Sequence, residues 1–93
     1  MNIRYYIDPM TDMPHIYSHR VSENEVEDIL SKPGEDRSGR DRSRVALGQT
    51  RAGRYLRVIY VLEYKPKSIF VITAFDLIGK PLIAYKRRSQ KKR

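Results

Sequence analysis

Three segments rich in β-branched and aromatic residues follow one another late in the chain, and they constrain the fold most strongly. They cover residues 44–50, 54–64 and 69–76, and three or four residues join each to the next. Links this short predict antiparallel neighbours, because a parallel connection needs a dozen residues or more. Gly53 lies in the first link, where glycine permits the left-handed backbone of a three-residue hairpin. The sequence therefore predicts an antiparallel sheet.

The longest segment, residues 54–64, has two different faces. Side chains alternate along a strand, so one face carries Leu56, Val58, Tyr60 and Leu62. The opposite face carries Tyr55, Arg57, Ile59, Val61 and Glu63. We expect the first face to pack in the core and the second to be a working surface at its polar early end.

A helix is predicted over residues 22–32, ahead of the three strands. Ser22 and Glu25 have the spacing of a capping box, in which each side chain binds the other residue's backbone amide. An apolar stripe at helical spacing consists of Val26, Ile29 and Leu30. Pro33-Gly34 ends the helix.

Shorter elements complete the predicted order. Residues 3–7 are expected to form a strand, residues 12–19 one or two helical turns, and residues 34–43 a loop without large apolar side chains. A last helix starts at Gly79-Lys80-Pro81, and its basic end, residues 86–93, is expected to fray. Residues 1–93 therefore form a single α+β domain: a small antiparallel β-sheet of about four strands, with two N-terminal-side helices and a C-terminal helix on one side of it.

The charge of the chain is unevenly distributed. Residues 1–41 hold five Lys/Arg and nine Asp/Glu, a net charge of −4, whereas residues 42–93 hold fourteen Lys/Arg and two Asp/Glu, a net charge of +12. A one-sided positive field concentrates polyanions. The pattern favours a nucleic acid or an acidic protein as partner, over a membrane surface or a basic surface that serves only solubility.

The composition argues against several classes of function. The chain has no cysteine, which removes disulfides and thiolate metal sites, and two histidines alone argue against structural zinc. We expect no metal and no cofactor. The N-terminus has no signal-peptide pattern, and no apolar stretch has the length of a membrane span. We expect a cytoplasmic protein without a membrane partner.

The remaining reactive side chains suit the cleavage of RNA. Without a metal, cleavage needs a base for the 2′-hydroxyl proton, fixed cations for the phosphorane, and an acid for the leaving 5′-oxygen. Histidine titrates near neutral pH, and arginine offers a planar fork to phosphate. The candidate catalytic residues are His19, Arg57 and Tyr60. The candidate RNA-binding residues are Arg51, Arg54, Tyr55, Lys80, Arg87 and Arg88.

Each candidate also has a structural explanation. His15 and His19 share one face of a helical turn, and either can cap or pack locally. His19 is the better candidate because it lies just before the well-capped helix. Arg57 can form a surface pair, and Tyr60 falls among core positions, where packing is its commoner use. The basic residues of the hairpin tip and the last helix can equally be solvated charges.

Several short motifs resemble the BrnT family of bacterial toxins. They are His19-Arg20-Val21-Ser22, Gly48-Gln49-Thr50, the run from Gly53 to Tyr60, and Val71-Ile72-Thr73-Ala74. The similarity covers about residues 15–76, with a weaker match in the last helix. The resemblance implies a RelE-like fold, ribonuclease activity that blocks translation, and neutralisation by a cognate antitoxin. It matches His19 to the family's histidine, and Arg54 and Arg57 to its basic hairpin residues.

The chain departs from the family pattern after the last strand's Thr73-Ala74. Family members commonly carry an arginine there, whereas this chain has Phe75-Asp76, and residues 77–93 contain no counterpart of the family's acidic residue. Lys80 and Arg87 are possible substitutes. The leading hypothesis is a metal-independent endoribonuclease toxin that cleaves mRNA, with the ribosome as a further candidate partner. The alternatives are a non-catalytic nucleic-acid-binding module and a protein-interaction domain. The cleavage sequence, ribosome dependence, antitoxin identity, oligomeric state and catalytic activity itself stay open.

Overall fold

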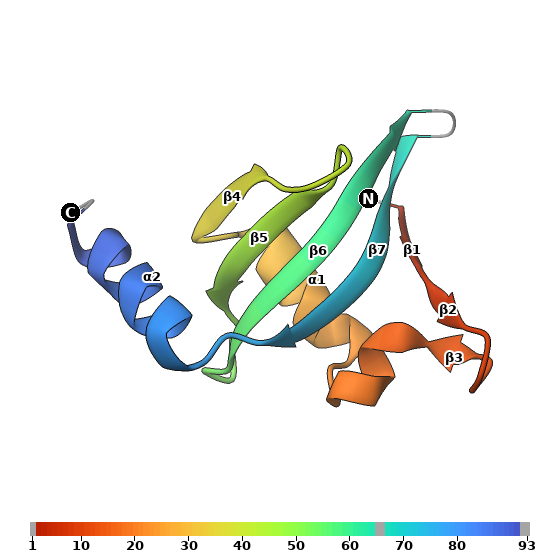
Figure 1. The fold of residues 1–93 in the computed structure, drawn as a ribbon, viewed down its shortest axis with the longest axis horizontal. Helices are drawn as coiled ribbons and strands as arrows, with labels where there is room; N and C mark the ends of the chain where they lie inside the picture. The colour runs from red at the N-terminus through yellow and green to blue at the C-terminus, as the bar shows by residue number, and fades with distance from the viewer. Residues whose placement is uncertain (1, 65–66, 92–93) are drawn as a thin grey trace.

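The computed structural model describes residues 2–64 and 67–91, and within them the centre is a five-stranded sheet (Figure 1). Its strands are β1 (Ile3–Tyr5), β4 (Glu35–Ser38), β5 (Arg44–Gln49), β6 (Tyr55–Tyr64) and β7 (Lys67–Asp76). Their order in space is β1-β7-β6-β5-β4. Strands β4 to β7 pair antiparallel, which confirms the three predicted central strands, but β1 pairs parallel to β7. The sheet is therefore mixed, and the expectation of about four antiparallel strands is wrong.

The predicted helix has the expected cap. Helix α1 spans Glu23–Ser31, the Ser22 Oγ accepts from the Glu25 amide at 3.2 Å, and the Glu25 carboxylate accepts from the Ser22 amide at 3.0 Å. Val26 and Ile29 are fully buried. The predicted turns before it are the 3-10 helix η1, His15–His19.

The predicted N-terminal strand is divided. After β1, the chain forms a separate two-stranded antiparallel ribbon of β2 (Ile7–Asp8) and β3 (Met13–Pro14). The ribbon leads directly into η1, and Figure 1 shows both on the side of the sheet formed by β1 and β7. This arrangement places Asp8 of β2 next to His15 of η1.

The expected loop over residues 34–43 contains the edge strand β4, which sequence reading missed. Its side chains are polar, and the two carboxylates among them bind residues on neighbouring elements. Asp36 accepts from Arg44 at 3.0 Å and from the Tyr60 hydroxyl at 2.6 Å, and Glu35 accepts from Arg88. An edge strand needs only one ladder and no apolar face, so hydrophobic periodicity does not reveal it.

The two α-helices cover opposite faces of the sheet, and the expectation of helices on one side is wrong. The larger core joins α1 and η1 to one face, through Ile16, Val26, Ile29, Leu56 and Val58 among others. The smaller core lies on the other face, where Leu47 and Leu77 meet Tyr85 of α2 (Gly79–Lys91). Neighbouring strand residues alternate between faces, so Leu56 packs in the core on the α1 face, whereas Tyr55 packs in the core on the α2 face.

Helix α2 starts where predicted and continues through the basic residues to Lys91. Residues 92 and 93 lie outside the described residues, and the expected fraying of residues 86–93 stays a prediction. Neither α1 nor α2 is long and apolar enough to cross a membrane, which is a statement about residues 2–64 and 67–91 alone.

Candidate nucleic-acid interface

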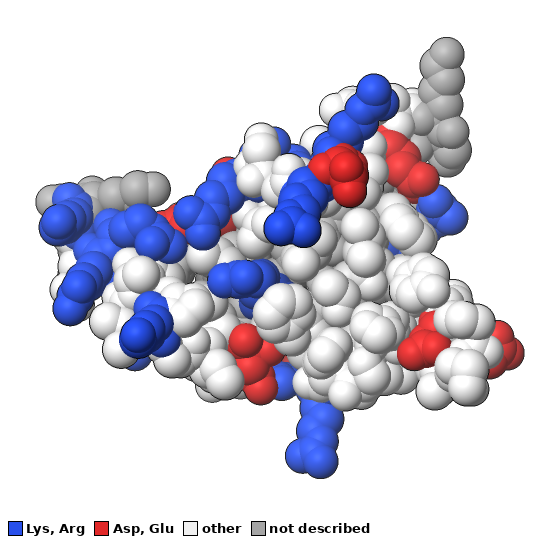
Figure 2. Space-filling model, viewed as in Figure 1, with Lys and Arg blue, Asp and Glu red and all other residues white. Residues whose placement is uncertain are grey.

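The face of the sheet opposite α1 is covered by α2 at one end only. Over β6 and β7 it carries Arg57 beside Phe75 and Ile59 beside Thr73, and all four are partly exposed. Figure 2 views this face: its middle, over β6 and β7, is largely uncharged, and Lys and Arg gather over α2 at one end. An apolar sheet surface next to cations is the kind of platform on which nucleobases stack.

Arg57 lies on this open face, and its hydrogen-bonding capacity is unused within the described chain. Its guanidinium carbon lies 5.7 Å from the centre of the Phe75 ring, within cation–π range. Its Nε is buried and has no hydrogen-bond partner, and none of the ion pairs found among the described residues includes it. A guanidinium held by stacking alone keeps its fork available for a phosphate.

His19 contacts the same aromatic ring. Its imidazole centre is 5.7 Å from that of Phe75, and it lines a shallow hollow of about 380 Å³ with Phe75 and Asp76. Phe75 therefore connects His19 to Arg57. Two of the three predicted catalytic residues therefore contact one aromatic side chain, which sequence spacing alone did not establish.

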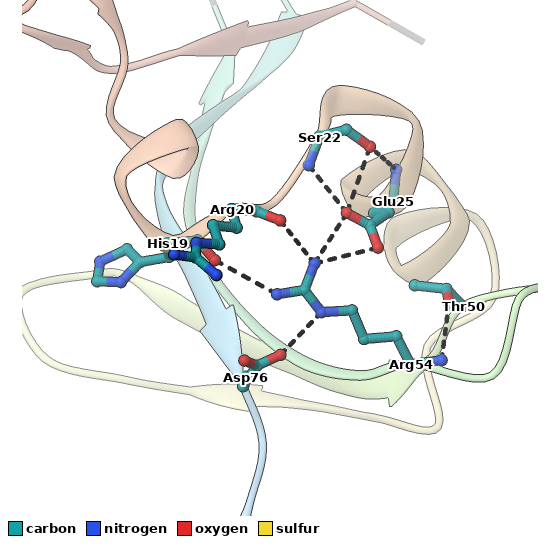
Figure 3. Close-up of polar contacts among 7 residues, drawn as sticks. All are labelled: His19, Arg20, Ser22, Glu25, Thr50, Arg54 and Asp76. Atoms are coloured by element: carbon teal, nitrogen blue, oxygen red, sulfur yellow. Dashed lines mark hydrogen bonds and ion pairs between the residues drawn. The ribbon is translucent and has the colours of Figure 1, made fainter.

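Arg54, three residues before Arg57, has a different environment (Figure 3). Its guanidinium donates to Asp76 at 2.8 Å, to Glu25 at 3.0 Å, and to the backbone carbonyls of Arg20 at 2.7 Å and His19 at 3.3 Å. The cation thus ties the segment between η1 and α1 to the sheet. Figure 3 shows the His19 ring directed away from this network, so Arg54 holds the backbone of His19 and leaves its imidazole accessible.

The titration of this network fits a structural role for Arg54. Burial alone would raise the pKa of Glu25, but the Ser22 amide and the Arg54 guanidinium together lower it below its ordinary value. The pKa of Arg54 is raised, mainly by Asp76 and despite partial burial, with Glu25 as a further cause. Each group stabilises the charged form of the other, so Arg54 is occupied within the protein. RNA binding by Arg54 stays a prediction without geometric support.

Tyr60 lies away from His19 and Arg57. It is 4% exposed, belongs to the core on the α1 face, and donates to Asp36 at 2.6 Å. Burial, followed by this contact with Asp36, raises the pKa of Tyr60 to about 12. A phenol that is buried, hydrogen-bonded and has a raised pKa is suited to packing in the core. The geometry gives no support to a catalytic role for Tyr60.

Tyr55 and α2 form a second group at the far end of the open face. The Lys86 ammonium lies 4.9 Å from the Tyr55 ring centre, and Tyr55 packs edge-on against Tyr85. A hollow of about 360 Å³ is lined by Gln49, Tyr55, Tyr85, Lys86, Ser89 and Gln90. An aromatic ring beside a cation suits a stacked base, but Lys86 was not among the predicted residues.

The other predicted RNA-binding cations do not converge on Arg57. Arg88 is paired with Glu35 at 2.5 Å, and Arg51 is exposed at the hairpin tip, 3.6 Å from Asp28. Lys80 and Arg87 are on α2, where Lys80 is exposed and Arg87 is exposed on the basic side. The basic side chains therefore fall into three groups: Arg57 on the open face, those exposed on α2, and those paired with acids of the protein.

The residues that sequence reasoning missed are Phe75 and Asp76. They were read as a departure from a family pattern, yet Phe75 contacts both His19 and Arg57, and Asp76 binds Arg54. The sequence did contain a signal for Asp76, because it and Glu63 are the only acids after residue 41, in the strongly basic part of the sequence.

The comparisons with known proteins give no assignment. No family model matched the chain, and neither did any curated protein or solved structure. Among the described residues, no three His, Cys, Asp or Glu side chains lie close enough to hold a metal ion.

Proposed function

We propose that this protein is a metal-independent endoribonuclease of the RelE-like kind, and that its site is the His19–Phe75–Arg57 surface. The observation that carries the proposal is a guanidinium without a hydrogen-bond partner stacked on a ring whose other neighbour is an imidazole. Arg57 would bind the phosphodiester and stabilise the phosphorane. His19 would transfer a proton, and Phe75 would stack on a base.

The reaction assigned to this site is transfer of the phosphoryl group within RNA. The 2′-oxygen forms a bond to phosphorus as its proton leaves to a base, and the bond to the 5′-oxygen breaks as that oxygen takes a proton from an acid. The products are a 2′,3′-cyclic phosphate and a 5′-hydroxyl. DNA of the same sequence lacks the 2′-hydroxyl and is not expected to react.

Cleavage of a single-stranded RNA by the purified chain in EDTA tests the proposal. We expect both products from RNA and none from the matching DNA, and a rate that falls about 100-fold in Arg57→Ala, since one stabilising donor is lost. Arg37→Ala is the matched control, because Arg37 is exposed on the edge strand β4. Equal rates in the two variants would contradict the assignment of Arg57.

The proposal extends to a toxin that cleaves mRNA, inhibits translation and is neutralised by an acidic antitoxin. The resemblance to BrnT toxins and the basic surface of α2 support this extension. Induced expression should arrest growth, and Arg57→Ala should relieve the arrest. An acidic reading frame beside the gene should restore growth when both are expressed.

A non-catalytic RNA-binding module is the second candidate. It is favoured by Lys86 over Tyr55, which pairs a cation with an aromatic ring away from any histidine. Salt-sensitive RNA binding without cleavage products would support this module and reject the enzyme.

A further inference from the structure

A second histidine lies beside His19 and is held by a carboxylate. The His15 and His19 ring centres are 5.4 Å apart, with an interplanar angle of 79°. His15 Nδ1 lies 3.3 Å from Asp8 Oδ2, and the two side chains are 33% and 20% exposed. The pair is therefore partly shielded from water yet open enough for a substrate to reach. In the sequence analysis His19 was preferred to His15 because it lies just before the well-capped helix; the contact with Asp8, seven residues earlier on β2, was not foreseen.

The fold fixes both members of this pair. The other carboxylate oxygen of Asp8 accepts from the Met10 amide at 2.9 Å, which holds the side chain across the turn of the β2–β3 ribbon. The backbone amide of His15 donates to the Tyr6 carbonyl at 2.9 Å. The Met10 amide, and after it His15, lower the pKa of Asp8 below its ordinary value. The carboxylate is therefore ionised at neutral pH and faces His15 Nδ1.

An ionised carboxylate at Nδ1 sets the tautomer of the imidazole. Nδ1 then carries the proton and donates it to Asp8, so Nε2 is left with a lone pair that can accept a proton. The titratable groups in contact with His15 in the described chain are Asp8, His19 and Tyr6, whose ring centre is 6.1 Å away. Asp8 is the only carboxylate among them, and its contact with Nδ1 leaves Nε2 as the nitrogen that can accept a proton.

We propose that His15 is the general base of the cleavage site, with Asp8 as its positioning residue and His19 as the general acid. The inference rests on the proposed function. In the step, His15 Nε2 takes the 2′-hydroxyl proton, the 2′-oxygen attacks phosphorus, and the 5′-oxygen leaves with a proton from the His19 imidazolium. One proton is gained at His15 and one is lost at His19, so the site carries the same charge before and after.

Asp8→Asn is the test variant, with Asp12→Asn as its matched control. Asparagine retains an oxygen for the Met10 amide but presents NH₂ to His15, which favours the opposite tautomer. Asp12 lies in the same turn and has a left-handed backbone with φ 59° that asparagine tolerates. Among the described residues the carboxylate bonded to His15 is that of Asp8, not that of Asp12. His15→Gln removes the imidazole itself and serves as a second variant.

Two measurements are made on the full chain. Long-range ¹H–¹⁵N spectra at neutral pH report which ring nitrogen of His15 carries the proton, without reference to activity. Cleavage of the RNA used above gives kcat and KM as a function of pH. We expect an Nδ1–H tautomer that Asp8→Asn reverses, a fall in kcat of about 10- to 100-fold with KM unchanged, and a larger fall in His15→Gln.

The outcomes separate this inference from the function on which it rests. Wild-type cleavage, with Asp8→Asn and His15→Gln as active as Asp12→Asn, overturns the role of His15 and leaves the ribonuclease standing. A wild-type His15 protonated at Nε2 overturns it as well. No cleavage by the wild-type chain overturns the proposed function, and the role of His15 falls with it.

Discussion

Arg54 directly precedes β6 and Arg57 lies within it, three residues later, yet the two side chains have opposite environments. Arg54 binds two carboxylates and two backbone carbonyls in the network that joins η1, α1 and the end of β7. Arg57 lies over Phe75 on the open face, and its buried Nε has no partner. The chemistry of the side chain is identical, so the difference comes from where distant parts of the chain place their acceptors.

The comparison shows which side of the molecule carries stability and which is available for ligands. Buried donors in folded proteins are nearly always paired, and those of Arg54 follow this rule. An unpaired polar group costs free energy, and sites that tolerate the cost are commonly functional ones. Hydrogen-bond partners therefore separate an arginine bound within the protein from one left available to a ligand, a difference that charge and sequence position do not reveal.

The largest expected difference is in stability, when each arginine is replaced by methionine. Arg54→Met leaves Glu25 and Asp76 without their cation, and we expect about 2 kcal/mol of lost stability, less than for a fully buried pair because the Arg54 side chain is 28% exposed. Arg57→Met should change stability by about 0.5 kcal/mol or less. Urea unfolding midpoints measure both, and equal losses would contradict the assignment.

Replacement of Phe75 tests through RNA binding whether the open face is the ligand-binding face. Phe75→Ala removes the ring that contacts both His19 and Arg57, and a stacked base should lose about 1–2 kcal/mol of affinity, or roughly tenfold. Phe75→Tyr keeps an aromatic face and is the control. Fluorescence anisotropy with a labelled single-stranded RNA measures the affinities; identical binding by all three chains would exclude stacking on Phe75.

The Arg54 network should make the protein sensitive to acid. The pKa of Glu25 is lowered in the folded state, so its contribution to stability is present above its ordinary value and is lost as the pH falls through the lowered one. We expect Glu25→Gln to reduce the loss of stability below about pH 4 by about 1 kcal/mol. Unfolding free energies measured between neutral pH and pH 3 test this, and parallel curves for the two chains would contradict it.

Two hydroxyls on opposite faces give the smallest effects. Tyr60→Phe removes the hydrogen bond to Asp36 and should cost about 1 kcal/mol, because Asp36 keeps Arg44 as a partner. Thr73→Val replaces a buried hydroxyl that has no partner, so its effect should lie within about 0.5 kcal/mol of zero. Thermal unfolding of both variants measures the two losses of stability. A larger loss in Thr73→Val than in Tyr60→Phe would contradict this prediction and show that the open face contributes to stability.

Local patterns predicted much of this fold. The capping box at Ser22 and Glu25, the alternation along β6 as far as Tyr60, and the glycine hairpin, in which Gly53 has φ +100°, depend on neighbours in sequence and were confirmed. The expectation that Leu62 also packs in the core is wrong: it is 41% exposed, beyond the register shift between Ile59 and Tyr60. Edge strand β4 and the parallel pairing of β1 with β7 depend on partners far along the chain. No local period encodes such partners, because they are set by the packing of the whole domain.

The candidate site was less predictable for the same reason. Alternation placed Arg57 on the face away from the core, which the structure confirms. It could not show that Arg54 meets Glu25, 29 residues away, or that Asp8 meets His15 through the β2–β3 turn. Tyr60 was chosen for its chemistry, although its own alternation placed it among core positions, and burial explains why that choice lacks support.

The different availability of the two guanidinium groups is measured most directly from their Nε–H signals in ¹H–¹⁵N spectra while single-stranded RNA is added. The account predicts that the Arg57 signal shifts progressively with RNA, whereas the Arg54 signal stays in place because its donors are already bound to protein acceptors. A stationary Arg57 signal at RNA concentrations that saturate binding, or a shift confined to Arg54, would contradict it.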